Sequence, residues 1–286
     1  MVAMISLAAG TCARAMDWIA LHEKADQITV QEALENVERN SESMKDLYVL
    51  GLVYLNQYET QSARQVFQKI KAQDASTVEA RWGMAEVLRR EHRYDESVPV
   101  LEALEKEYPD FAPALITLAY IHYIQRDYNG AVKLTGEVIN MGQDNVDASN
   151  YLRAHGLYAA AKGMLAHYGG PFSKAVNGAA VLKHLHIIQK IRPGSPVVNF
   201  GLGSYYMLIP KILGRDLNKA EDYLQKTIEA DPLFPDPYVR LAQIFRVRGD
   251  NKKYQDLLEK ALQLDPANEL ALDIRSRECH FICLTD

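Results

Sequence analysis

The sequence predicts an all-α solenoid of antiparallel helix pairs, and three observations support this fold class. A 34-residue pattern is written twice in succession between Leu47 and Pro109. Small residues recur in it where two helices must approach closely, and bulky apolar residues recur where helices must interlock. Short polar turns, at residues 57–60 and 91–95 for example, separate the helical stretches. Because each hairpin packs only on its neighbours, residues 16–286 can form a single continuous array.

The N-terminal part of the array is predicted to be irregular. Two short amphipathic helices are readable between residues 17 and 40, where the repeat letters are mostly lost, as suits a terminal repeat that faces solvent on one side. Residues 1–15 carry a short apolar run followed by Ala13-Arg14-Ala15, which has the small-x-small form of a signal-peptidase site. This segment is either a signal remnant or a first helix, so exported or periplasmic and cytoplasmic locations both stay open.

Regular repeats follow at residues 43–143 and again at 236–266, and one last helix over residues 268–284 is expected to cap the array. Residues 145–233 form enlarged, irregular repeats. Their first hairpin is longer than the regular spacing by 13 residues around Gly169-Gly170-Pro171, and a second insertion lies within residues 209–216. Pro210 ends a helix there, and two aliphatic residues stand in what should be a polar turn, so we expect them to cover something.

The pattern resembles the tetratricopeptide repeat, whose letters follow W-x2-L-G-x2-Y and then A-x3-F. One copy in this chain reads Leu47, Leu50, Gly51, Tyr54, Ala63 and Phe67. The resemblance implies a right-handed superhelix whose first helices line a concave groove. Carried onto this sequence, the groove positions that we expect to contact a partner are Tyr48, Leu52, Asn56, Trp82, Glu86, Arg89, Arg90, Tyr120, Tyr123, Arg153, Phe200, Ser204, Gln243 and Arg246.

This predicted lining is aromatic with interspersed arginines, the residue types that supply rigid anchors in protein interfaces. We therefore expect a non-enzymatic scaffold that binds a polypeptide segment. The expected anchors are Trp82, Tyr120, Tyr123, Arg89 and Phe200. The alternative is that several of the groove residues, Tyr48 in particular, pack against the neighbouring hairpin instead.

A second similarity covers the enlarged repeats. The run Gly203-Ser204-Tyr205-Tyr206, then Pro210, residues 213–216 and Lys219-Ala220, is similar to the periplasmic repeat subunit associated with tripartite ATP-independent (TRAP) transporters. That family implies an accessory protein with a small apolar ligand pocket. The residues expected to wall such a pocket are Tyr206, Met207, Pro210, Ile212 and Leu213.

Composition and spacing argue against other classes. The net charge of −5 and the pI near 5.9 lack the basic balance of nucleic-acid binders, so no nucleic acid is expected. No run approaches the ~18 apolar residues of a transmembrane helix. His184 and His186 point to different helix faces and cannot chelate together, and no nucleophile, cofactor or metal motif is recognisable. Homo-oligomer formation is left open.

Three cysteines are too few for a disulfide framework in a chain of this length. Cys279 and Cys283 are four residues apart and would share one face of the predicted last helix. A local disulfide or half of a metal site is conceivable there, whereas two small apolar residues on a capping helix is the interpretation that we favour.

Overall fold

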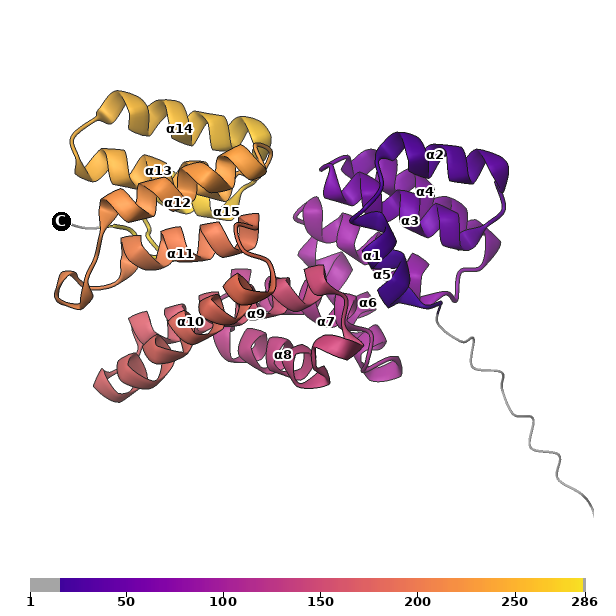
Figure 1. The fold of residues 1–286 in the computed structure, drawn as a ribbon, viewed down its shortest axis with the longest axis horizontal. Coiled ribbons are helices and arrows are strands. Elements are labelled where there is room, and N and C mark those ends of the chain that lie inside the picture. The colour runs from indigo at the N-terminus through magenta and orange to yellow at the C-terminus, as the bar shows by residue number, and fades with distance from the viewer. Residues whose placement is uncertain (1–15, 285–286) are drawn as a thin grey trace, which may run out of the picture. The chain divides into compact units, whose positions relative to one another are not determined.

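The computed structural model describes residues 16–284, and in this range it contains fifteen α-helices, two short 3-10 helices and no strand (Figure 1). The prediction of an all-α fold is confirmed. In chain order the helices are α1 (Trp18–Ala25), α2 (Val30–Arg39), α3 (Met44–Asn56), α4 (Thr60–Gln73), α5 (Val78–Arg90), α6 (Tyr94–Glu107), α7 (Ala112–Ile124), α8 (Tyr128–Met141), η1 (Gln143–Asn145), α9 (Ala148–Tyr168), α10 (Pro171–Ile191), α11 (Pro196–Leu208), η2 (Lys211–Leu213), α12 (Leu217–Ala230), α13 (Asp236–Val247), α14 (Asn251–Leu264) and α15 (Glu269–Ser276).

The chain divides into two compact units, which we call unit 1 (described from residue 16 to 100) and unit 2 (101–284). The division falls within α6. None of the helices in residues 16–284 combines the length and the apolar character that crossing a membrane requires.

Unit 1 is held together around Phe67 of α4, which is fully buried. The ring lies between α3 and α5, because a Cβ atom added at Gly51 would come within 2.7 Å of it and one added at Gly83 within 2.4 Å. The repeat glycine Gly51 therefore has a packing role: it leaves room for the aromatic residue of the same hairpin. This explains why the small letter and the bulky letter of the pattern recur together.

Unit 2 contains four helix hairpins, formed by α7 with α8, α9 with α10, α11 with α12, and α13 with α14. Their first helices also contact one another in order, α7 with α9, α9 with α11 and α11 with α13. We call these four helices the inner layer of unit 2. This arrangement of hairpins is the one that the repeat pattern predicts.

The enlarged hairpin keeps the repeat topology but lengthens both of its helices. Helices α9 and α10 have 21 residues each, whereas the neighbouring α8 and α12 have 14. The extra length expected around Gly169-Gly170-Pro171 takes the form of about two additional helical turns on each side of that turn.

The C-terminal cap differs from the prediction of one helix over residues 268–284. Helix α15 ends at Ser276, because Arg277 adopts a left-handed conformation with φ of 65°. Cys279 and Ile282 also have positive φ. Cys279 and Cys283 form a disulfide in this irregular segment, so the favoured interpretation of two small apolar residues on a helix is wrong.

Candidate functional site

The groove positions predicted in unit 1 are mostly interior. Tyr48, Leu52, Trp82 and Glu86 have exposed fractions of 0%, 4%, 2% and 1%. Asn56 is exposed at the end of α3. Trp82 contacts other rings rather than solvent, with centroids 6.1 Å from Tyr48 and 6.5 Å from Phe67. Trp82 and Tyr48 are therefore both packed in the interior of unit 1, where they contact other aromatic rings.

The short helix α1 covers these aromatic residues. It packs on α3, and Figure 1 shows it beside α3 and α5. The Nε2 atom of His22 lies 2.9 Å from the hydroxyl oxygen of Tyr48, and its ring centroid is 5.5 Å from that of Trp82. Trp18 meets the His22 ring edge-on at 5.9 Å. A segment of the chain itself thus lies where the resemblance places a bound polypeptide.

The α1 segment is also fixed by its polar ends. The backbone N–H of Met16 donates to a carboxylate oxygen of the buried Glu79 at 2.9 Å, and Lys24 pairs with Asp46 at 3.2 Å. Burial raises the pKa of Glu79, while its hydrogen bonds partly offset that shift. An amide donor on a buried carboxylate is costly to remove, so α1 is held by more than apolar contact.

Arg89 and Arg90 are held within unit 1. Both pair with the buried carboxylate of Glu86, at 2.7 and 2.9 Å. Arg90 also donates to the carbonyl oxygen of Leu55 at 2.7 Å, which links α5 to α3. The two guanidinium groups therefore neutralise a buried charge and satisfy a helix end, a structural role that the sequence did not reveal.

The predicted positions in unit 2 lie on its inner layer. Tyr120 and Tyr123 come from α7, Arg153 from α9, and Phe200 and Ser204 from α11; all five are half-buried. On α13, Gln243 is buried at 3% exposure, whereas Arg246 is exposed.

Burial raises the pKa of Tyr123 to about 12, so its phenol keeps the proton that it can donate. Phe200 contacts Phe234 edge-on at 5.0 Å. The hydroxyl of Ser204 is buried and finds no hydrogen-bond partner among the described residues. The predicted positions in the inner layer of unit 2 thus combine aromatic and guanidinium groups with one buried hydroxyl group.

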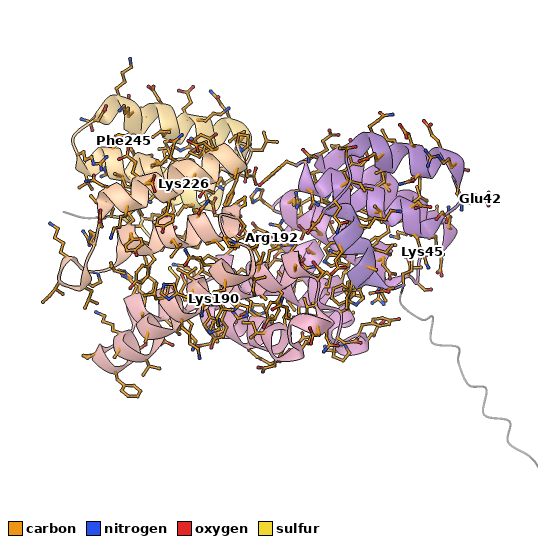
Figure 2. All side chains as sticks on the ribbon, viewed as in Figure 1. Glu42, Lys45, Lys190, Arg192, Lys226 and Phe245 are labelled. Carbon is orange, nitrogen blue, oxygen red and sulfur yellow. A yellow bond between two sulfur atoms is a disulfide. The ribbon has the colours of Figure 1, made fainter. Side chains whose placement is uncertain are left out.

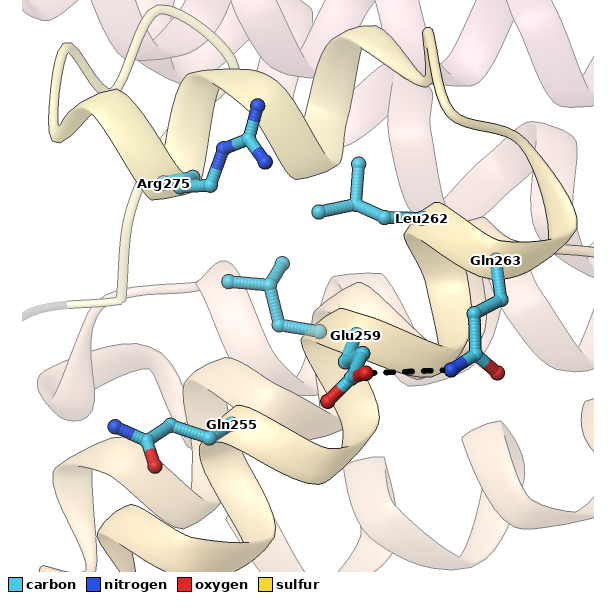
Figure 3. Close-up of a pocket in the computed structure, with 6 residues that line it drawn as sticks. Gln255, Glu259, Leu262, Gln263 and Arg275 are labelled. Carbon is cyan, nitrogen blue, oxygen red and sulfur yellow. Dashed lines mark hydrogen bonds between the residues drawn. The ribbon is translucent and has the colours of Figure 1, made fainter.

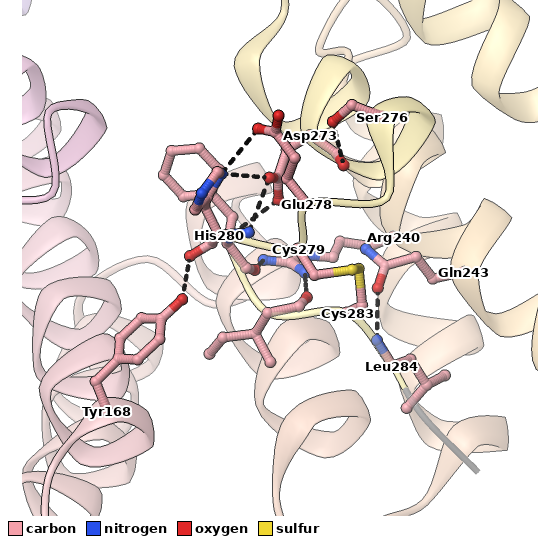
Figure 4. The surroundings of a disulfide bond; sticks show 12 residues. Tyr168, Arg240, Gln243, Asp273, Ser276, Glu278, Cys279, His280, Cys283 and Leu284 are labelled. Carbon is pink, nitrogen blue, oxygen red and sulfur yellow. Dashed lines mark hydrogen bonds and ion pairs between the residues drawn. A yellow bond between two sulfur atoms is a disulfide. The ribbon is translucent and has the colours of Figure 1, made fainter.

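Part of this inner layer holds the C-terminal segment, residues 277–284 (Figure 4). The buried guanidinium of Arg240 donates to the carbonyl oxygens of Ile282 and Phe281, at 3.0 and 3.2 Å. The side-chain oxygen of Gln243 accepts from the backbone N–H of Leu284 at 2.8 Å. All three of these hydrogen bonds are to main-chain atoms, so α13 binds the backbone of an irregular polypeptide segment, while the side chains of Phe281 and Leu284 are buried in apolar clusters.

Other groups also bind the C-terminal segment. Tyr168 donates to the carbonyl oxygen of His280 at 2.7 Å, and the carboxylate of Asp273 accepts from the backbone N–H groups of His280 and Phe281 at 2.8 and 2.9 Å. The ring of Phe281 lies 5.9 Å from that of Tyr123. The sequence showed none of these contacts, because a buried Arg and a buried Asp carry no repeat letter.

Two side chains of this segment and one of α15 come within metal-binding reach of one another. Ligand atoms of Asp273, Glu278 and His280 lie within 4.8 Å of each other in the described part of the chain. The Asp273 carboxylate, however, already accepts from backbone amides and from the His280 ring at 3.0 Å. Its function here is to hold the C-terminal segment.

The residues predicted to wall an apolar pocket do not enclose one. Met207 is fully buried in a cluster that includes Leu224, Leu241 and Leu284. Ile212 and Leu213 are 92% and 69% exposed, and Pro210 is exposed as well. Tyr206 stacks on Tyr223 at 5.9 Å. The expectation that the aliphatic residues of the insertion cover something within the chain is therefore wrong.

An open depression of about 380 Å³ lies elsewhere in unit 2, on α14 and α15 (Figure 3). Its lining combines Leu258 and Leu262 with polar side chains such as Glu259 and Arg275. The Gln263 amide donates to Glu259 at 3.4 Å across one helical turn. Nothing in this lining is a converging set of buried polar groups, so it offers no defined ligand site.

Two histidines meet inside the enlarged hairpin. The Nδ1 atoms of His155 in α9 and His184 in α10 are 2.8 Å apart. Burial, together with the neighbouring His184, lowers the pKa of His155 to about 4. The ring of Tyr158 stacks on His184 at 4.3 Å. The pair therefore joins the two long helices as neutral rings near pH 7.

Comparison with known proteins shows similarity to a family of helical repeats. Residues 83–137 match the tetratricopeptide repeat family. The human tetratricopeptide repeat protein 21A is 21% identical over 253 residues, which is 86% of this chain and 18% of the human protein. The chain thus spans less than a fifth of that relative.

Solved structures share the fold at low identity. A tetratricopeptide repeat protein from Parabacteroides merdae has a TM-score of 0.55 and 12% identity, covering 90% of this chain and 96% of that one. The APC/C hetero-tetramer Cut9–Hcn1 gives a TM-score of 0.61 at 12% identity, over 90% and 49% of the two chains. The human IFIT1 dimer with m7Gppp-AAAA gives 0.58 at 16%, over 88% and 58%. None of these matches supports the similarity to the transporter-associated subunit.

Proposed function

Because the chain carries tetratricopeptide repeats, we propose that it is a non-catalytic scaffold that binds a polypeptide segment along the inner layer of unit 2. Helix α1 occupies the corresponding positions of unit 1, so the partner site belongs to α7, α9 and α11. The partner is a protein or peptide, and the ligand is taken in an irregular or extended conformation.

The observation that carries this proposal is the way in which α13 holds residues 281–284. Arg240 and Gln243 bind carbonyl and amide groups of the backbone at 2.8 to 3.2 Å. Main-chain recognition of this kind supplies affinity that does not depend on the bound sequence. A partner segment that continues along the same layer would meet Tyr120, Arg153 and Phe200, and those side chains would supply the specificity.

The side chains of Tyr120, Arg153 and Phe200 suit a short peptide segment that carries one acidic or polar group and one apolar group. Arg153 has a planar guanidinium that pairs with a carboxylate or with carbonyl oxygens. Tyr120 and Phe200 are half-buried aromatics, which lose little conformational freedom on binding. We therefore expect micromolar rather than nanomolar affinity, because few side chains are engaged.

Panning of a random-peptide phage library against the immobilised full chain tests the proposal. The comparison protein is the double variant Tyr120→Ala/Arg153→Ala. The matched control is Glu137→Ala/Lys226→Ala, which changes two side chains on the second helices α8 and α12. We expect enriched peptides to bind the double variant about tenfold more weakly and the control unchanged. Equal binding to all three proteins would refute the proposed site.

A further inference from the structure

A long stretch of unit 2 contains no acidic residue. Residues 148–215 include eight Lys and Arg residues and not one Asp or Glu, whereas the other 218 residues carry 37 acidic against 24 basic side chains. The stretch spans α9, α10, α11 and η2. Although the chain has a negative net charge, residues 148–215 carry a local excess of positive charge. This range also lies within the enlarged, irregular repeats.

The tip of the enlarged hairpin exposes apolar side chains within this stretch. Phe172 and Val176 stand one helical turn apart on α10 and are 83% and 53% exposed, and Tyr168 at the end of α9 is 56% exposed. Lys174, between the first two in sequence, is exposed too. Since α9 and α10 exceed the ordinary helices by about seven residues, the tip extends about 10 Å further than a regular hairpin would.

The second insertion repeats this combination. Ile212 and Leu213 in η2 are 92% and 69% exposed, and Lys211 precedes them. In Figure 1 the α10 tip and the η2 loop both project at the left-hand edge of unit 2. The acid that follows the loop, Asp216, caps α12 by accepting from the backbone N–H groups of Asn218 and Lys219, so its charge is directed to the helix.

Other cations of the stretch lie along the same long hairpin. Lys183 is exposed in the middle of α10, and Figure 2 labels Lys190 and Arg192 at its C-terminal end. Lysines beside projecting aromatic and aliphatic side chains are the arrangement by which interfacial proteins meet lipid: the rings enter the acyl boundary and the ammonium groups bind phosphate.

We propose that the α10 tip and the η2 loop dock unit 2 on the surface of a bilayer that contains anionic phospholipid. Phe172, Ile212 and Leu213 enter the boundary between headgroups and acyl chains, and Lys174 and Lys211 bind headgroup phosphates. A fluid apolar phase suits these residues better than a folded partner does, because they are 69–92% exposed and project from two separate tips rather than forming one continuous apolar patch. This attachment goes beyond the proposed scaffold function and uses different residues.

Flotation of the full chain with vesicles tests the proposal. The vesicles contain phosphatidylcholine alone or with about 25 mol% phosphatidylglycerol, at about 50 mM and about 500 mM NaCl. We expect the protein to float with the anionic vesicles at low salt and to remain at the bottom with phosphatidylcholine alone. High salt should release most of the bound protein, because the lysine contribution is screened.

Two variants with matched controls separate the two contributions. The apolar variant is Phe172→Ser/Ile212→Ser/Leu213→Ser, and its control is Tyr58→Ser/Leu233→Ser, whose residues are 41% and 42% exposed elsewhere. The charge variant is Lys174→Gln/Lys211→Gln, and its control is Lys71→Gln/Lys252→Gln. Loss of these two interfacial lysines should weaken vesicle binding about 25-fold, at roughly fivefold for each. Both controls should bind like the wild type.

Several results would overturn the proposal. Wild-type protein that stays unbound on anionic vesicles at low salt is one, and equal flotation of the apolar or the charge variant is another. Retention of the wild type by polyglutamate or by oligouridylate, without flotation, would instead assign the basic stretch to an acidic protein or to RNA. All altered side chains are exposed, so circular dichroism should be unchanged and loss of folding is separable from loss of binding.

Discussion

Replacement of Trp82 by alanine should destabilise unit 1 rather than abolish partner binding selectively. The side chain is 2% exposed and touches the rings of His22, Tyr48 and Phe67. Removing a buried tryptophan leaves a cavity and typically costs about 3–5 kcal/mol. Because the indole also supports α1 through His22, we expect a value near the middle of that range, about 4 kcal/mol.

Hydrogen exchange followed by mass spectrometry is the suitable assay, since it reports the free energy of opening for each helix in a chain with two units. Protection of α3, α4 and α5 should fall together in Trp82→Ala. The matched control is Asn56→Ala, an exposed position predicted for the same groove, which should change stability by at most about 0.5 kcal/mol. A loss below about 1 kcal/mol for Trp82→Ala would refute the packing argument and restore this residue as a surface anchor.

Three further predictions concern other parts of the chain. Gly83→Ala should lower the free energy of unfolding of unit 1 by about 1–3 kcal/mol in a urea titration, because the added Cβ would lie 2.4 Å from the Phe67 ring; Gly178→Ala, with open space around it, should cost nothing comparable. Replacement of Cys279 and Cys283 by serine should destabilise the C-terminal cap by about 2 kcal/mol, given the short loop that the disulfide closes, and reductant should then have no further effect on melting. In the folded chain the pKa of His155 is lowered to about 4. Between pH 4 and the usual pKa of about 6.5 the unfolded chain therefore binds more protons than the folded chain. The contribution of His155 to the free energy of unfolding should fall by roughly 3 kcal/mol as the pH drops through this range. Burial raises the pKa of Asp236 to about 6, so this group changes the stability in the opposite sense. We therefore compare the pH dependence of the free energy of unfolding between wild type and His155→Gln. Parallel pH profiles for the two proteins would contradict the assignment to His155.

The sequence predicted the fold because the repeat letters have a direct geometric meaning. Gly51 and Phe67 recur together since one makes room for the other within a hairpin, and that contact is local. The enlarged hairpin was also recognisable, because its glycines and proline mark a turn at an unusual distance from the repeat letters. Packing between adjacent helices is thus encoded at short range.

The candidate site was harder to predict, because it depends on contacts between distant segments. The repeat pattern assigned Tyr48 and Trp82 to the inner face. It could not show that His22 contacts both residues, because α1 carries no repeat letter. Helix α15 ends at Ser276 without a glycine or proline to mark its end. The disulfide was therefore not the favoured interpretation, and the contacts that hold residues 277–284 were not predicted. Exposed Ile212 and Leu213 show that apolar residues in an insertion need not cover their own chain.

The central claim is that the inner layer of unit 2 receives a polypeptide segment, and hydrogen exchange of the full chain with a phage-selected peptide tests it most directly. We predict that saturating peptide protects backbone amides of α7, α9 and α11, the helices that carry Tyr120, Arg153 and Phe200. Protection confined to the second helices α8, α10, α12 and α14, or to unit 1, would contradict the claim.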